Sequence, residues 1–443
     1  MKPVGVCIIG AGWAGLAAAV RLTQAGEAVT LLEAAPHPGG RARGVDLAGT
    51  RLDNGQHLLL GAYGQTLDLV RELGVQESAA FLRLPMDLGI RRAGAADIGL
   101  SSLYLPTPLH LLGGLLTARG LPALARLRAL PGLARLMRWQ GREDCSVLAL
   151  LHRYRQPGCL IDGLWAPLCV ATLNTAPERA SARLFTAVLR GAFSGHRSHS
   201  DLLMPRGSLS AALPDPAVHW LQAHGARVHL GCRVQALRPQ PGGGFHLALR
   251  GGDTLAARQV VLATAHPEAA RLLAPLPGLS ETVTRLRRLQ TEPICTVYLQ
   301  YAESARLPTP LLGLLGTTGQ WVFDRRFAGE PGRMAVVISA SGPHMALDRF
   351  ALAGRIQEEL AGFFPEWGRP QESWVIRERQ ATFRAGVGCD ALRPENATPL
   401  PGLWLAGDYT ATGLPGTLEG AVISGVQCAQ AMTHPTRGTK PTP

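Results

Sequence analysis

Lysine is almost absent from this chain of 443 residues. The only two are Lys2 and Lys440, one near each end, so nearly all of the positive charge comes from arginine. Their positions exclude a mechanism that needs a lysine inside the folded body, because chain ends are rarely part of a core. The net charge of +12 predicts an anionic partner or surface. Nucleic acid is not expected, since the basic segments lack interleaved Tyr or Phe and carry no known binding motif.

Three further absences narrow the class of protein. The eight cysteines are scattered, with no CxxC pair and no His at metal-ligand spacing, so we expect reduced core thiols and no metal site. No uninterrupted apolar run reaches roughly 18 residues, so no helix should span a bilayer. The N-terminus starts a strand at once and shows no signal-peptide pattern. We therefore expect a cytoplasmic, globular protein of two or three domains.

The first segment has the pattern of strand, tight turn, helix and strand. Residues 4–9 form a short apolar run of the kind that is buried on both faces of a parallel sheet. Gly10, Gly12 and Gly15 then match GxGxxG, which permits the turn, the approach of a pyrophosphate and close packing of the helix on the strand. Glu33 ends the second strand, where its carboxylate can accept hydrogen bonds from ribose hydroxyls. This arrangement predicts a dinucleotide site.

A glycine pair and two arginines follow directly, in the stretch PHPGGRARG. Gly39 and Gly40 allow the backbone to lie along a pyrophosphate or a ribitol chain, and Arg41 and Arg43 add guanidinium groups to bind it. This pattern favours a flavin dinucleotide over NAD. The alternative interpretation is a basic turn.

The C-terminal region repeats the pattern of a nucleotide-binding strand and helix. Residues 403–406 form an apolar strand, Gly407 and Asp408 follow, and a helix should begin near residue 418. Asp408 is placed for a ribitol hydroxyl, and the helix N-terminus would stabilise the anion on a reduced flavin ring. The residues that we expect to form this N-terminus are Thr417, Leu418, Glu419 and Ala421.

A middle segment completes the predicted nucleotide domain. Residues 225–263 have the pattern of a β-meander followed by a strand that ends at Ala263, and Val234 lies where such folds bind adenine through the backbone. Three separated segments should therefore build one domain.

Together, the GxGxxG with Glu33, the GGRAR, the DNGQH at residues 53–57 and the closing LAGDYTATGLPGTLEGAVISG resemble the flavin amine oxidase and phytoene desaturase superfamily. Within it, the chain most resembles the bacterial squalene-associated FAD-dependent desaturases, the hydroxysqualene dehydroxylases of hopanoid synthesis. The resemblance implies FAD and an α/β fold: a discontinuous Rossmann-type FAD-binding domain with an inserted α+β substrate domain. We place the FAD-binding domain at 1–85, 205–275 and 395–435, the substrate domain at 86–204 and 276–394, and a flexible tail at 436–443.

Three functions compete. The resemblance favours reductive removal of the hydroxyl of hydroxysqualene, with FADH2 as hydride donor and a long-chain isoprenoid as substrate. The second is oxidation by the flavin, of a polyene or of an amine, and the third is a non-enzymatic, FAD-stabilised carrier of isoprenoids at a membrane. Amine oxidation is disfavoured because the superfamily's amine oxidases commonly place a lysine by flavin N5 and an aromatic residue where Thr417 stands. The sequence indicates no electron donor for the flavin.

Polar residues stand beside leucines in LDNGQHLLLGAY, residues 52–63. In related flavoproteins this segment runs under the isoalloxazine ring, which brings Gly55 close to the flavin and turns the next two residues towards the substrate. A histidine beside a carboxylate can stay protonated near neutral pH. We therefore expect His57, supported by Asp53, to protonate the leaving hydroxyl and Gln56 to hold it. The alternative is that His57 and Asp53 only satisfy loop backbone groups.

Residues 103–140 are leucine-rich and basic, and no acidic residue lies between Asp97 and Glu143. Over residues 133–139, leucines and arginines fall on opposite helix faces, as in an interfacial helix on anionic lipid. Residues 121–130 are less regular, because Arg128 falls among the leucines. This pattern predicts peripheral contact at the inner face of the cytoplasmic membrane, and the alternative is a helix of the protein core.

Overall fold

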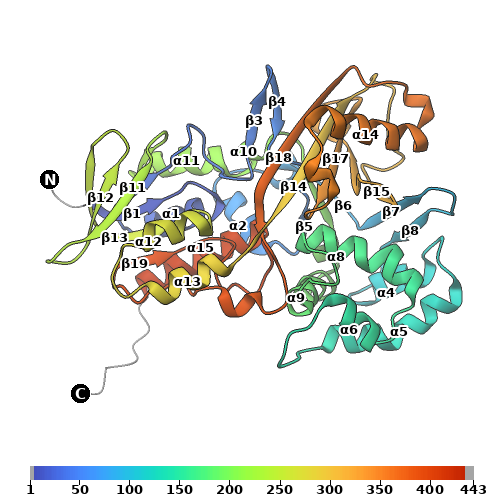
Figure 1. The fold of residues 1–443 in the computed structure, drawn as a ribbon, viewed down its shortest axis with the longest axis horizontal. Coiled ribbons are helices and arrows are strands. Elements are labelled where there is room, and N and C mark those ends of the chain that lie inside the picture. The colour runs from blue at the N-terminus through green and yellow to red at the C-terminus, as the bar shows by residue number, and fades with distance from the viewer. Residues whose placement is uncertain (1–3, 435–443) are drawn as a thin grey trace.

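Strand β1, Val4–Ile9, is buried along its whole length because it lies between two parallel neighbours in a sheet that helices cover on both faces. The structure is a computed structural model that describes residues 4–434, and the predicted tail at 436–443 lies outside the described residues. Figure 1 shows this first sheet in one lobe and a second sheet in the other. The α/β fold class predicted from the sequence is confirmed.

The first sheet draws its strands from three distant parts of the chain. Its order is β10 (Arg227–His229), β2 (Val29–Leu32), β1, β13 (Thr254–Leu262), β12 (Phe245–Leu249) and β11 (Val234–Pro239), and β19 (Leu403–Leu405) pairs with β13. The pairs β10–β2, β2–β1, β1–β13 and β13–β19 are parallel, whereas β11, β12 and β13 form an antiparallel meander. The helices of this lobe are α1 (Trp13–Gln24), α11 (Pro214–Ala223), α12 (His266–Leu273), α13 (Ser280–Arg288) and α15 (Leu418–Thr433).

Helices α1 and α15 pack closely because small residues face one another. Four alanines of α1 are buried. On α15, a Cβ added to Gly425 would lie only 2.2 Å from the carbonyl oxygen of Ala14. The first and last helices of the described chain are therefore in direct contact, on the face of the sheet that Val6 and Ile8 share with them.

One face of the second sheet packs on a helix, and the other faces the interior of the molecule. Its order is β18 (Glu372–Phe383), β14 (Thr291–Gln300), β17 (Arg333–Ser339), β16 (Trp321–Asp324), β15 (Leu311–Leu315), β7 (Asp87–Arg92) and β8 (Ile98–Ser101). Cys295, Val297 and Leu299 pack with helix α14, Arg349–Phe363, whereas Tyr298 belongs to the larger core on the other side. This alternation is the period of two that a strand imposes.

Helices form a layer against the inner face of the second sheet, at the lower right of Figure 1. They are α4 (Leu109–Thr117), α5 (Ala123–Arg138), α6 (Val147–Arg153), α7 (Gly158–Leu160), a π-helical turn (Ile161–Trp165), α8 (Ala166–Leu173) and α9 (Ala182–Phe193). Short elements join the two lobes: β3 (Gly44–Leu47), β4 (Thr50–Asp53), β5 (Leu59–Leu60), α2 (Gly64–Glu72), α3 (Glu77–Ala80), β6 (Phe81–Leu84), β9 (Leu202–Pro205) and α10 (Leu209–Ala212).

The second half of α5 is a core helix and not the interfacial helix that its pattern predicts. Leu133 and Leu136 are 2% and 0% exposed, and Trp139 is buried as well, because this face packs on the other helices of the layer. The less regular half before it exposes Leu124 and Leu127. Between residues 4 and 434, no helix is long and apolar enough to cross a bilayer.

The contact of α1 with α15 predicts that Gly425→Val destabilises the protein. The added side chain would overlap the backbone of α1 and should lower the free energy of unfolding by about 1–3 kcal/mol. Gly354→Ala is the matched control: nothing lies within 4 Å of its added Cβ inside α14, so stability should rise by about 0.5–1 kcal/mol. Thermal unfolding followed by circular dichroism measures both, and equal melting temperatures for the two variants would contradict the packing.

Candidate active site

The GxGxxG loop turns the chain from β1 into α1 and leaves open space in front of the helix. Gly10 has a φ of +108°, and a Cβ on Gly15 would lie 2.0 Å from the carbonyl oxygen of Gly10. At Gly12, by contrast, nothing lies within 4 Å of an added Cβ. That space belongs to a cavity that Gly12 and Trp13 line. The first-turn amides of α1 lack intrahelical acceptors, so this end of the cavity suits an anion.

The second glycine pair packs directly against the first motif. The amide of Gly39 donates to the carbonyl of Ala11 over 2.8 Å. A Cβ on Gly40 would lie 3.2 Å from the Cα of Gly12, and both glycines of the pair have positive φ. Besides any contact with a cofactor, the two glycines therefore allow the two loops to touch, because they carry no side chains.

Glu33 lies at the same end of the cavity as Val234. Its Oε2 accepts from the amide of Ala11 over 2.7 Å and its Oε1 from the amide of Ala35 over 2.8 Å. Each carboxylate oxygen keeps a further lone pair, which a ribose hydroxyl can use. Val234 is 3% exposed at the start of β11 and lines the cavity beside it.

Arg41 and Asp408 form an ion pair in the middle of the cavity wall. Arg41 Nη2 lies 2.7 Å from Asp408 Oδ1, and Arg41 Nη1 donates to the carbonyl of Ala381 over 2.8 Å. Burial disfavours the charge on Arg41, but the attraction and the hydrogen bond of Asp408 outweigh it and raise the pKa of Arg41. Arg43 instead donates to the carbonyl of Gly40. These side chains thus hold the loops together at the positions where we expect ribitol and pyrophosphate.

The N-terminus of α15 presents its backbone to the cavity. Thr417 is the N-cap, with its Oγ1 accepting from the amide of Gly420 over 3.0 Å. The side chain of Glu419 is buried and caps α2, accepting from the amide and the hydroxyl of Thr66 over 2.9 and 2.6 Å. Burial raises the pKa of Glu419. The carboxylate of Glu419 thus fixes α2 to α15.

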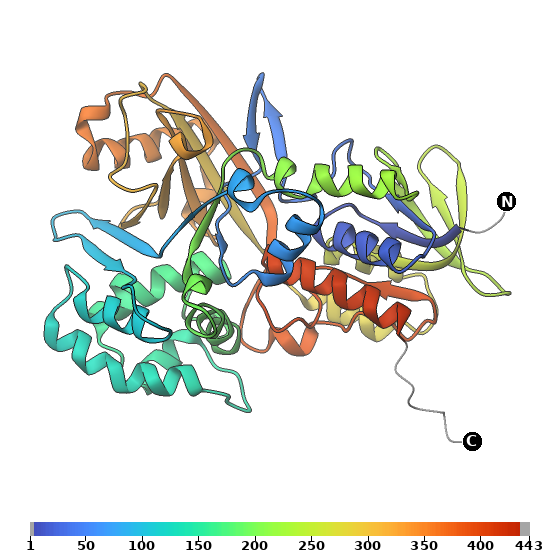
Figure 2. The ribbon, with the colours of Figure 1, turned by 180° about the vertical axis from the view of Figure 1, so that it is seen from behind.

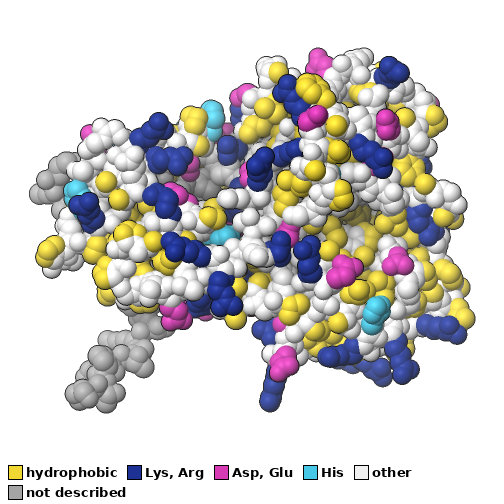
Figure 3. Space-filling view, viewed as in Figure 1, with side chains coloured by type: hydrophobic (Ala, Val, Ile, Leu, Met, Phe, Trp, Pro, Cys, Tyr) yellow, Lys and Arg dark blue, Asp and Glu magenta, His cyan; other side chains and the backbone are white. Residues whose placement is uncertain are grey.

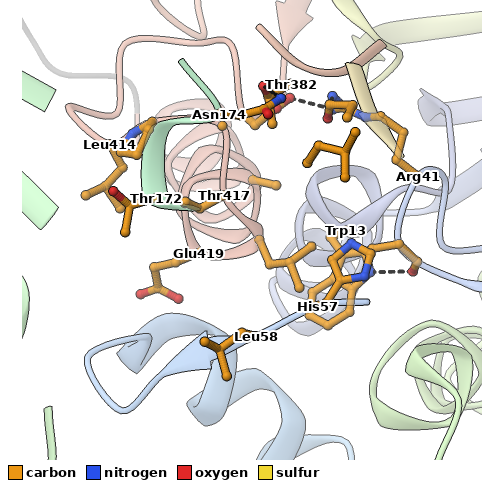
Figure 4. A pocket seen from close by; sticks show the side chains of 18 of the residues that line it. Trp13, Arg41, His57, Leu58, Thr172, Asn174, Thr382, Leu414, Thr417 and Glu419 are labelled. Carbon is orange, nitrogen blue, oxygen red and sulfur yellow. Dashed lines mark hydrogen bonds and ion pairs between the residues drawn. The ribbon is translucent and has the colours of Figure 1, made fainter. Parts of the chain in front are cut away.

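One continuous cavity of about 710 Å³ joins these motifs to the helical layer. At its far end the walls are apolar, formed by Leu111, Leu115, Leu133, Trp165, Phe185 and Phe193. Figure 4 shows His57 and Leu58 on one side of the pocket, with Asn174 and Thr382 across from them. The DNGQH segment therefore lies where the dinucleotide end meets the apolar end.

His57 lines the cavity but does not pair with Asp53. Its Nδ1 lies 2.9 Å from the carbonyl of Gly55, whereas Asp53 Oδ1 accepts from the amide of Leu209 over 2.9 Å and from Ser208. Burial lowers the pKa of His57, and the nearby charge of Asp53 only partly offsets this. This lowering works against the protonated resting state that we expected for His57. Because a carbonyl oxygen can only accept, the contact with Gly55 places a proton on Nδ1.

Gln56 is held by residues that sequence reasoning missed. Its Oε1 accepts from Nη1 of Arg325 over 2.7 Å, and its Nε2 donates to the carbonyl of His57. Arg325 is 2% exposed and pairs with Glu330 over 2.8 Å. No local pattern could have indicated Arg325, because it meets Gln56 only through the second sheet.

Glu378 is a cavity residue that the sequence did not indicate. It lies on β18, and its Oε2 accepts from Nδ2 of Asn54 over 3.2 Å. The structure therefore brings a carboxylate from the second sheet to the loop that carries His57. The assignment of catalytic roles in this loop stays a prediction.

A side chain at residue 12 should remove the cofactor without unfolding the protein. The added Cβ of Gly12→Val meets only the open space of the cavity, so the variant should lose its bound FAD and melt at the temperature of the FAD-free wild type. Glu33→Ala should lower the FAD content as well. The wild type should release FAD on acid denaturation, because GDYTATG contains no Cys or His for a covalent link. Absorption spectra and chromatography of the released flavin test this, and FMN, or normal FAD in Gly12→Val, would refute it.

Comparison with known sequences agrees with this geometry. Residues 13–433 match the family described as flavin containing amine oxidoreductase. A hydroxysqualene dehydroxylase from Rhodopseudomonas palustris is 34% identical over 434 residues, which covers 96% of this chain and 97% of that protein. A zeta-carotene desaturase from Synechocystis is 25% identical over 490 residues, which covers 96% of each chain.

Solved structures share the fold. Cyclohexylamine oxidase from Brevibacterium oxydans superposes with a TM-score of 0.70 at 18% identity, covering 99% of this chain and 100% of the other. An identity that low speaks for the fold alone, whereas the family match spans nearly all described residues. The chain therefore belongs to the flavin-containing amine oxidoreductase family and is an FAD-dependent oxidoreductase.

Proposed function

We propose that this enzyme removes the hydroxyl group of hydroxysqualene by reduction and releases squalene, a precursor of hopanoids and other triterpenoids. One observation carries the proposal: a single cavity joins the dinucleotide motifs to an apolar chamber. A hydrocarbon chain suits such walls, because polar groups would lose their hydrogen bonds to water there without replacement. The hydroxysqualene dehydroxylase that is 34% identical over nearly the full chain supports the same substrate.

The residues present fit FAD. The open space before Gly12 suits the pyrophosphate, Glu33 suits the ribose, and the first turn of α15 suits the flavin ring. Arg41 and Asp408 would hold the ribitol that joins the pyrophosphate to the flavin ring. When bound and reduced, the flavin supplies a hydride.

The chain's own residues then act on the substrate. The apolar walls exclude water and so lengthen the life of the allylic cation that forms when the hydroxyl departs. His57 gives that hydroxyl a proton, so that it leaves as water, and the cation takes up the hydride. The alcohol, one proton and one hydride thus balance as squalene and water. Burial lowers the pKa of His57, and a negative charge entering the cavity would favour its protonated form.

Asp53 and Gln56 support this role through the loop. Asp53 fixes the loop to the amide of Leu209, and Gln56 fixes it to Arg325. Both contacts limit where the imidazole can lie, which is what a proton donor requires. Gln56 therefore serves the reaction as a positioning residue, in place of the direct hold on the hydroxyl that the sequence predicted.

Two other oxidoreductase functions are weaker. Desaturation of a polyene would use the same cavity, and the 25% identical zeta-carotene desaturase supports it less strongly. Amine oxidation fits poorly, since the cavity ends in leucines and phenylalanines and Thr417 takes the place of an aromatic wall. A carrier without catalysis would not need reducing equivalents.

Peripheral contact with the inner face of the cytoplasmic membrane is part of the proposal. A long isoprenoid dissolves far better in lipid than in water, so the enzyme has to meet its substrate at a bilayer. The net charge of +12 has the sign that anionic lipid attracts.

Anaerobic incubation distinguishes these functions. Protein reduced chemically and mixed with hydroxysqualene should form one squalene per flavin, and the yellow colour should return as it does so. A desaturase would instead be bleached when the oxidised protein meets a polyene. Squalene extracted and measured by gas chromatography gives the answer, and its absence under these conditions would refute the proposed function.

His57→Ala should slow a single turnover at least tenfold, which corresponds to about 1.4 kcal/mol in the barrier, while leaving FAD content and melting temperature unchanged. In the wild type the rate should fall as pH rises, because only the protonated imidazole acts, and this fall should be absent from the variant. His219→Ala is the control, since His219 is exposed on α11. A variant that keeps full activity would show that another group supplies the proton.

A further inference from the structure

The exposed apolar surface of the molecule is concentrated around two helices. Nine large hydrophobic side chains are exposed in residues 4–434, and six of them lie between residues 104 and 127. They are Tyr104, Leu105, Leu109, Leu116, Leu124 and Leu127. We call the surface that they form the α4–α5 face. Single exposed leucines are ordinary, but a cluster marks a surface that meets a partner. Figure 2 shows α4 and α5, in cyan and teal, at the outer corner of the helical layer.

Positive charge lies beside the leucines of the α4–α5 face. No acidic residue lies between Asp97 and Glu143, whereas exposed arginines occur throughout this stretch. These arginines are Arg119, Arg128, Arg135, Arg138 and Arg142. In Figure 3, basic side chains gather along the lower edge of the helical layer, next to hydrophobic ones. Leucines flanked by arginines match the interfacial zone of an anionic bilayer, where the apolar groups enter the acyl chains and the guanidinium groups meet phosphates.

Helix α4 lies between this face and the cavity. Leu111 and Leu115 are each 3% exposed and line the cavity, whereas Leu109 and Leu116 on the same helix are 53% and 39% exposed. The helix, LHLLGGLLT, contains no Asp, Glu, Lys or Arg. On α5, Leu133 lines the cavity in the same way. One layer of uncharged side chains therefore divides an apolar surface from an apolar chamber.

We propose that the α4–α5 face docks on an anionic bilayer and that the isoprenoid substrate passes from the bilayer into the cavity beside α4. This inference rests on the proposed function, because it assigns the route by which that substrate arrives. A hydrocarbon that took this route would meet lipid, leucine side chains and then the chamber, without crossing water. Entry from the dinucleotide end would instead carry it past charged and polar side chains such as Arg41 and Glu378.

Two charges placed on the face test the proposal. Leu109→Glu with Leu116→Glu adds carboxylates where the acyl chains would lie, at side chains that do not line the cavity. Phe350→Glu is the matched control, because Phe350 is 71% exposed on α14 in another part of the molecule. Binding to phosphatidylglycerol vesicles is measured by sedimentation, and turnover is measured with hydroxysqualene either in those vesicles or in detergent micelles.

The double variant should bind the vesicles at least tenfold more weakly and convert vesicle-borne substrate at least tenfold more slowly. Its FAD content and its turnover in micelles should match the wild type, and Phe350→Glu should match the wild type in every assay. Normal vesicle binding by the double variant would overturn the docking face. Normal vesicle-borne turnover despite lost binding, or an equal loss in vesicles and micelles, would overturn the route.

The test also separates this inference from the proposed function. If the wild type converts no hydroxysqualene in either medium, the proposed function fails, and the vesicle-binding results still decide the docking face. If micelle turnover is normal in all proteins, the proposed function stands whatever the vesicles show.

Discussion

The parallel alignment of β2, β1, β13 and β19 puts the carboxyl ends of four strands at one edge of a sheet, and the site depends on this constraint. Gly10 follows β1, Glu33 follows β2, Ala263 follows β13 and Gly407 follows β19, and all four line the cavity. Backbone pairing thus gathers residues that are hundreds of positions apart in the chain. Loops at this edge of an open α/β sheet are the usual place for a ligand.

Local rules explain why the nucleotide elements could be predicted. The apolar run at residues 4–9 is β1, the expected strand at residues 403–406 is β19 over Leu403–Leu405, and the closing helix begins at Leu418 as expected. Each depends on its own residues: an apolar run buried on two sides, or glycines where a turn requires them. The glycine pair Gly39 and Gly40 has a further reason that the sequence did not show: without a side chain, Gly40 can lie close to Gly12 of the other loop.

Partners far away in the chain explain what could not be predicted. Asp53 bonds a residue 156 positions away, Gln56 one 269 away and Glu419 one 353 away. A polar residue near a ligand motif does not show whether its side chain faces the ligand or holds a loop. Amphipathic spacing has the same weakness, because Leu133 would show the same pattern whether it met lipid or core. Hydrogen-bond partners answered the first question, and burial answered the second.

The bond between Glu419 and the start of α2 has a consequence for the order of events during synthesis. The ribosome makes α15 after every other helix and strand of residues 4–434, yet α15 covers α1 and its Glu419 caps α2, two elements made among the first. Until the C-terminal helix emerges, the alanine face of α1 stays uncovered and the amides of α2 lack their acceptor. The nascent chain is therefore an incomplete apoprotein with exposed apolar surface, a state that is prone to aggregation. Because the N-terminus of α15 forms part of the cavity, a complete cofactor site exists only after this helix has been made.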